Sequence, residues 1–178
     1  MRIRTLKLRD AHCKPGADPS FCSILWDQKS LDLVTASSAD PGVSIHNSLL
    51  PSEPPRIILH HKDGVTALAL SPNSTCLASG SIDRSVKLLK FPGGEIEADI
   101  KRFTLPVRTL ALNNSGTMLA AAGDDEGIKI IYTFDGTISR VLKGHKAPIT
   151  TVAFDPLSEY FASLDSSGTA VIWEMQSG

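Results

Sequence analysis

The sequence repeats itself with a fixed period, and this constrains the fold more than any other feature. The segment VTALAL at 65–70 returns as VRTLAL at 107–112 and as ITTVAF at 149–154. The steps from 65 to 107 and from 107 to 149 are each 42 residues. A period in this range is typical of architectures in which one supersecondary unit is copied and neighbouring units cover each other.

Two further segments recur in the same register. LAS at 77–79 returns as LAA and FAS, and VKLL at 86–89 returns as IKII and AVIW. A fourth, degenerate copy precedes these three, with one extra residue at 39–41. We therefore treat residues 1–178 as one partial repeat domain. Its copies lie at about 12–50, 57–94, 99–137 and 140–178.

Each copy contains the pattern of four short β-strands. The first strand has the form V-x-x-V-x-F, and its missed alternation indicates a bulge. The second strand consists of small residues, as close packing between sheets requires. Because the strands have apolar residues on both faces, each sheet needs cover on both faces. Sheets arranged radially supply that cover, so the sequence predicts a β-propeller.

The fourth copy carries the most specific residues. Gly144-His145 stands ahead of its first strand, and Trp173 ends its third. With this spacing the chain resembles the WD-repeat family. The resemblance implies an all-β WD-repeat β-propeller with about four blades of an expected seven, which is an incomplete ring.

In the WD-repeat family, a His, a Ser or Thr, an Asp and a Trp form a buried hydrogen-bond network in each blade. Carried over by position, the resemblance implies His12, Thr35 and Asp40 in copy one, His61, Ser79 and Asp83 in copy two, Asp125 in copy three, and His145, Ser163 and Trp173 in copy four. Other residues occupy the remaining positions: His46 and Leu89 replace Trp, Ser167 replaces Asp, and copy three has Phe103, Ala121 and Ile131. On this reading no copy is complete, and the third must depend on apolar packing.

A His–Ser–Asp set also fits a hydrolase triad, which needs its serine beside a cavity and an oxyanion hole. Here the set recurs at the repeat period, which favours a structural role, and we expect no enzymatic activity. His60, His61 and Asp63 could hold a metal, and residues 124–126 could bind a cation. No second ligand pair has matching spacing, and a solvated turn explains the acidic run, so we expect no metal and no cofactor.

Several stretches outside the consensus resemble a narrower family more closely. They include LASGSIDRSVKLLKFPGGE at 77–95 and RFTLPVRTLALNNSGTMLAAAGDDEGIKI at 102–130. They are similar to the amino-terminal propeller of the chromosome transmission fidelity factors, also called WD-repeat and HMG-box or acidic nucleoplasmic DNA-binding proteins, in their plant-type form. This resemblance implies a nuclear hub that links the replicative helicase to polymerase α–primase and supports sister-chromatid cohesion. An adaptor of a ubiquitin ligase or chromatin-modifying complex, a cytoplasmic location and a non-functional fragment stay open.

Charge and composition narrow the partners. Eighteen basic and nineteen acidic residues give a net charge of -1, which offers no electrostatic drive toward nucleic acid or an anionic membrane. The three cysteines have no metal-ligand spacing and are expected to be reduced thiols. We therefore expect protein partners. The expected contact surface is a rim of loops made of Lys62, Asp63, Ile82, Arg84, Asp124, Glu126, Lys146 and Ser166.

Overall fold

A computed structural model describes residues 21–50, 52–59 and 61–175, in which the chain forms four antiparallel sheets. The first sheet contains β1 (Phe21–Trp26), β2 (Asp32–Ser37), β3 (Gly42–Asn47) and β4 (Arg56–Leu59); the second contains β5 (Val65–Leu70), β6 (Cys76–Ser81), β7 (Val86–Lys90) and β8 (Glu95–Ile100). The third contains β9 (Val107–Leu112), β10 (Met118–Gly123), β11 (Gly127–Tyr132) and β12 (Ile138–Lys143); the fourth contains β13 (Ile149–Phe154), β14 (Tyr160–Asp165) and β15 (Ala170–Glu174).

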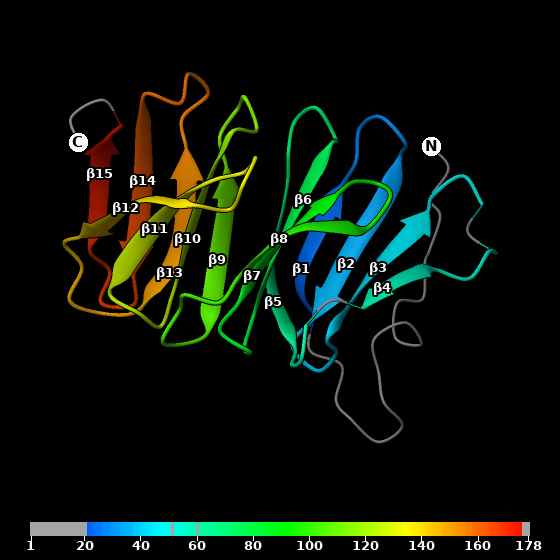
Figure 1. Ribbon diagram of the computed structural model, residues 1–178, viewed down its shortest axis with the longest axis horizontal. Coiled ribbons are helices and arrows are strands. Elements are labelled where there is room, and N and C mark those ends of the chain that lie inside the picture. The colour runs from blue at the N-terminus through cyan, green and yellow to red at the C-terminus, as the bar shows by residue number, and fades with distance from the viewer. Residues whose placement is uncertain (1–20, 51, 60, 176–178) are drawn as a thin grey trace.

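The sheets stand side by side in chain order, as Figure 1 shows from β1–β4 at one end to β13–β15 at the other. Their first strands are in contact in sequence: β1 with β5, β5 with β9, and β9 with β13. Within each sheet the strands follow one another as a meander. This is the arrangement of propeller blades around an axis, and it confirms the predicted all-β, incomplete propeller.

The predicted bulge is present in the first strand of every sheet. The pairing register shifts between Val65 and Ala67 in β5 and between Ile149 and Thr151 in β13, with equivalent shifts in β1 and β9. The skipped residue in β5 is Thr66, whose hydroxyl donates to the carbonyls of Gly80 and Val107. The bulged residue therefore connects one sheet to the next.

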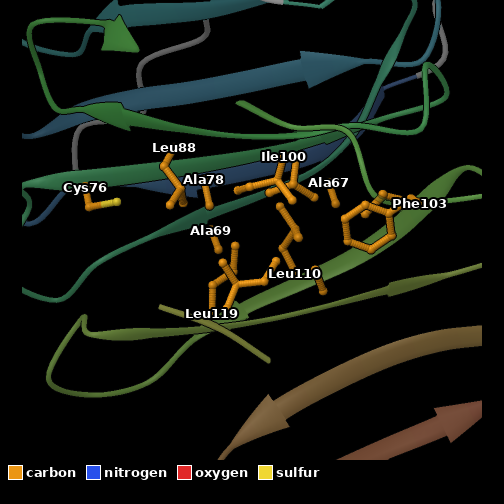
Figure 2. Close-up of a cluster of buried hydrophobic side chains, with 13 residues drawn as sticks. Ala67, Ala69, Cys76, Ala78, Leu88, Ile100, Phe103, Leu110 and Leu119 are labelled. Carbon is orange, nitrogen blue, oxygen red and sulfur yellow. The ribbon is translucent and has the colours of Figure 1, made fainter. Parts of the chain in front are cut away.

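Three apolar clusters fill the spaces between neighbouring sheets. Figure 2 shows the middle cluster, in which Leu88 and Ile100 of the second sheet point toward Leu110 and Leu119 of the third. Small residues such as Ala78, which is fully buried, allow the two sheets to approach closely. The Cys76 thiol is free and buried here, and burial raises its pKa to about 11.

The sequence copies and the sheets are out of step by one strand. The copy expected to begin at residue 57 starts inside β4, yet β4 pairs with β3 of the sheet before it. In the same way β8 and β12 pair with β7 and β11. Among the described residues, the fourth sheet consists of three strands.

The outer faces of the two end sheets are exposed and apolar. On the fourth sheet, Ile172 is 76% exposed and Tyr160 and Leu164 are partly exposed. On the first sheet, Ile24 and Trp26 are more than half exposed. Both faces have the residue composition of surfaces that neighbouring blades cover within the array.

Candidate interaction surface at one end of the sheets

One end of the sheets is built from loops that a repeated backbone hydrogen bond holds together. The N–H of Ile82 donates to the carbonyl of Gly64, at 3.0 Å. The same bond recurs 42 and 84 residues later, from Asp124 to Pro106 and from Ser166 to Pro148. In the second, third and fourth sheets it ties the turn between the second and third strands to the loop that precedes the first. All eight expected rim residues lie on these loops.

The fourth sheet has the fullest side-chain network behind this end. His145 Nε2 lies 2.6 Å from Ser163 Oγ, and Trp173 Nε1 donates to the same oxygen at 2.8 Å. His145 Nδ1 lies 2.8 Å from Asp165 Oδ2. His145, Ser163 and Asp165 are buried, so these hydrogen bonds form away from competing water.

The carboxylate of this network is not at the expected position. We expected the carboxylate position to be filled by Ser167, leaving the copy incomplete, but the structure shows Asp165 in that role, two residues earlier. Ser167 donates its hydroxyl to Asp165 Oδ1 at 2.6 Å. Together with His145, this bond holds the pKa of Asp165 at about 2, so the carboxylate is ionised at neutral pH.

Packing against the tryptophan explains the glycine of the Gly-His element. A Cβ on Gly144 would lie 2.8 Å from Cη2 of the Trp173 ring, closer than side-chain carbons approach. The ring also stacks on Phe161, with centroids 6.4 Å apart. The glycine therefore makes room for the tryptophan that donates to Ser163, so the two ends of the motif depend on each other.

The second sheet holds the three residues expected of it. His61 Nε2 lies 2.9 Å from Ser79 Oγ, and Nδ1 lies 3.1 Å from Asp83 Oδ2 and 3.0 Å from Ser85 Oγ. Burial lowers the pKa of His61 despite the nearby carboxylate of Asp83, so the imidazole is neutral at pH 7. Leu89, at the position equivalent to Trp173, is fully buried.

The first sheet has a reduced version. His46 stands at the tryptophan position, and its Nε2 lies 3.1 Å from Thr35 Oγ1. Asp40 accepts a hydrogen bond from the backbone N–H of Gly42 at 2.7 Å, so it stabilises its own turn. His12 lies outside the described residues.

In the third sheet, a different set of residues occupies the same place. Phe103 stands at the histidine position and is buried. Lys129 Nζ lies 4.1 Å from the centroid of its ring and 3.4 Å from Asp125 Oδ2. Asp125 also accepts hydrogen bonds from the backbone and hydroxyl of Thr104. A cation–π contact and an ion pair thus supplement the apolar packing expected here.

The rim residues differ in how they are held. Asp63 accepts from the backbone N–H of Gly64, and Asp124 pairs with Arg108 at 3.0 and 2.9 Å. Ile82 and Ser166 are held by the backbone bonds described above. The remaining four, Lys62, Arg84, Glu126 and Lys146, are exposed charged side chains that could reach a partner.

The polar groups described above have structural uses. Ser163 is 2% exposed and contacts both His145 and Trp173, so its hydroxyl has no open side for a substrate. Within the described ranges, no three His, Cys, Asp or Glu side chains gather closely enough to hold a metal ion. No helix in that part of the chain is long and apolar enough to cross a membrane.

Sequence reasoning missed three contributors to these networks. Ser85 and Asp165 were missed because a period assigns one residue to each position, whereas the carboxylate shifts by two residues between sheets. Lys129 was missed because a lysine within an apolar strand gives no signal of an aromatic partner. The recurrence of lysine 42 residues earlier, at Lys87, could have drawn attention to this position.

Comparison with known proteins agrees with this architecture. The family described as WD40, the WD domain or G-beta repeat, matches residues 52–89 and 136–174. These segments overlap most of the second and fourth copies and include their His–Ser–Asp networks. The structure of U3-55K has the same fold, with a TM-score of 0.80 over 90% of this chain and 50% of that one, at 15% identity.

Two curated proteins are similar in sequence. Protein ENHANCER OF LHP1 1 from Arabidopsis thaliana is 63% identical over 179 aligned positions. The alignment covers the whole of this chain but 19% of that protein. Nuclear distribution protein PAC1 from Ajellomyces capsulatus is 36% identical over 81 residues, which are 45% of this chain and 18% of that protein. The chain thus spans about a fifth of the length of the curated relatives it matches.

Proposed function

Because this chain carries WD40 repeats, we propose that it is a non-catalytic scaffold whose loop rim binds other proteins. The observation that carries the proposal is the repeated backbone bond from Ile82, Asp124 and Ser166, which fixes the rim loops in three successive sheets. A rigid end that presents exposed charges of both signs suits a protein surface. The buried imidazoles behind the rim make it rigid, and the loops of the rim contact the partner.

We further propose that the parent protein acts in the nucleus, at replicating chromatin, as a hub between the replicative helicase and polymerase α–primase. The support is the resemblance of the non-consensus stretches 77–95 and 102–130 to the chromosome transmission fidelity factors. The balanced charge of the chain favours protein contacts over direct contact with DNA.

Cross-linking and affinity capture from S-phase nuclei test this proposal. The bait is the full chain within its longest native product, and the matched control carries the rim substitutions Lys62→Glu and Lys146→Glu. We expect helicase or polymerase α subunits with the native bait and their loss with the control. Recovery of ubiquitin-ligase components without replication subunits would overturn it.

A second candidate follows from the similar Arabidopsis protein, whose name describes an enhancer of LHP1. In this alternative the chain belongs to an adaptor that acts with an LHP1 protein. Capture of an LHP1 homologue from nuclei outside S phase, lost with the same rim control, would favour this candidate.

A further inference from the structure

A pocket of about 280 Å³, lined mainly by charged residues, opens on the rim of the second sheet. Lys62 and Arg84 come from the two rim loops, Lys87 from β7, and Asp99 and Lys101 from the end of β8 and just beyond it. Phe103, in the loop that precedes β9 of the third sheet, completes the wall. The pocket therefore combines two expected rim residues with Lys87, Asp99 and Lys101, which were not among the expected site residues.

The charges of this pocket do not balance. Lys62, Arg84, Lys87 and Lys101 line it together with two carboxylates, Asp83 and Asp99. The excess is therefore two positive charges.

The ion pairs and hydrogen bonds within the pocket show which positive charges have no carboxylate partner. Asp99 is shared between Lys87 Nζ at 2.9 Å and Lys101 Nζ at 2.8 Å. Asp83 binds His61, Ser85 and the backbone of Lys62. Over the described residues, the side chains of Lys62 and Arg84 have no carboxylate within ion-pair distance.

The pocket is held in shape before any ligand arrives. Lys87 is 8% exposed, so its ammonium is fixed by Asp99 and not by water. Arg84 has a φ of 67° in a turn that its own N–H closes onto the carbonyl of Ser81. The Lys87 ammonium and the backbone of Arg84 are therefore in place before an anion enters, which reduces the entropy lost on binding.

We propose that this pocket binds a phosphorylated serine or threonine side chain of a partner protein. This inference rests on the proposed function of the rim as a protein-binding surface. A phosphate ester carries close to two negative charges at pH 7 and so matches the excess of two positive charges. A carboxylate would neutralise half of it. On the adjoining third sheet, Asp124 is paired with Arg108, and the exposed Glu126 disfavours an extended nucleic-acid backbone, which would have to pass along the same rim.

The repeat itself supplies the matched variants. Lys62 and Lys146 occupy the same position in copies two and four, both on exposed rim loops, but Lys146 does not line this pocket. Lys62→Glu removes the positive excess at the pocket, while Lys146→Glu makes the same change in charge elsewhere on the rim. Arg84→Asn removes the other unpaired cation with a residue that tolerates a positive φ.

The probe is a fluorescent pool of peptides that carry one phosphoserine or phosphothreonine between randomised flanks, with binding followed by anisotropy to the full chain. We expect at least tenfold tighter binding than for the same pool after phosphatase treatment or with glutamate at that position. Lys62→Glu and Arg84→Asn should each weaken binding by at least about tenfold, and Lys146→Glu by less than about twofold.

Three results would overturn the proposal: equal binding of the glutamate pool, equal loss with Lys146→Glu, or displacement of the peptides by a single-stranded oligonucleotide of equal charge. Far-ultraviolet circular dichroism of each variant distinguishes lost binding from lost folding. If the rim captures its partners equally well after phosphatase treatment, this inference fails while the proposed scaffold function stands.

Discussion

The second and fourth sheets carry the same repeat pattern and differ in how many of their faces are covered. All six residues of β6 are buried, whereas β14 alternates between exposed and buried residues. The third strands differ in the same way, since β7 is buried over its first four residues and β15 is not. Equivalent strands of the two sheets thus share an apolar sequence pattern, and the neighbouring sheets determine how much of that apolar surface is buried. The comparison makes burial a property of the array and not of the individual repeat.

The largest expected effect comes from one position in these two sheets. Leu88 is fully buried, while Ile172, 84 residues later at the same repeat position, is 76% exposed. Leu88→Ala should lower the free energy of unfolding by about 4 kcal/mol, because it removes buried methyl groups and leaves a cavity. Ile172→Ala should change it by less than about 0.5 kcal/mol. Urea unfolding of the full chain measures both, and equal losses would contradict the comparison.

A second pair tests close approach between sheets. A Cβ on Gly80 would lie 2.7 Å from Cγ1 of Val107 in the third sheet, whereas the fourth sheet has the partly exposed Leu164 at that position. Gly80→Leu, which introduces the residue of the fourth sheet, should cost about 3 kcal/mol through overpacking. Leu164→Ala is the control and should be nearly silent. A thermal midpoint unchanged by Gly80→Leu would show that these two sheets can separate.

The buried networks should behave alike in the two sheets although their cover differs, because each lies on a covered side. His145→Ala should cost about 2 kcal/mol, since it leaves Ser163 and Asp165 with fewer partners in a buried site. His61→Ala should cost about the same amount. Lys146→Ala, next to His145 but exposed, serves as the control in calorimetry. If His145→Ala is silent, the network of the fourth sheet contributes nothing to stability.

The smallest expected effect is on the pH dependence of the free energy of unfolding, and it concerns the network of the second sheet. Because burial lowers the pKa of His61 in the folded state, the unfolded chain binds a proton first as the pH falls below about 6.5. Stability is therefore lost with acidification, by at most about 0.8 kcal/mol at pH 6 from this residue. His61→Asn should make the dependence shallower by that amount between pH 7.5 and 6. Parallel urea curves for both proteins would show that His61 titrates normally when folded.

The periodicity of the sequence was enough to predict the strands, the bulge and the propeller, because backbone pairing and apolar faces recur with the period. It was also enough to place His61, Ser79, His145, Ser163 and Trp173 at equivalent positions. It could not identify Asp165 as the partner of His145, since a carboxylate at the end of the second strand or on the turn after it can reach the same nitrogen. The contact of Phe103 with Lys129 could not be predicted because a lysine within an apolar strand gives no signal of an aromatic partner. The pocket beside Lys87 joins side chains of copies two and three, which no single copy contains.

The one-strand offset between copies and sheets bears on how the molecule can be cut. The strands β4, β8 and β12 stand at or just before the start of copies two, three and four, yet each completes the preceding sheet. A truncation placed between copies, at residue 94, would remove β8 and open the β7 edge. A truncation between residues 101 and 106 would leave whole sheets on both sides. Deleting one copy together with the strand at its start would therefore also remove the fourth strand of the preceding sheet and weaken that sheet.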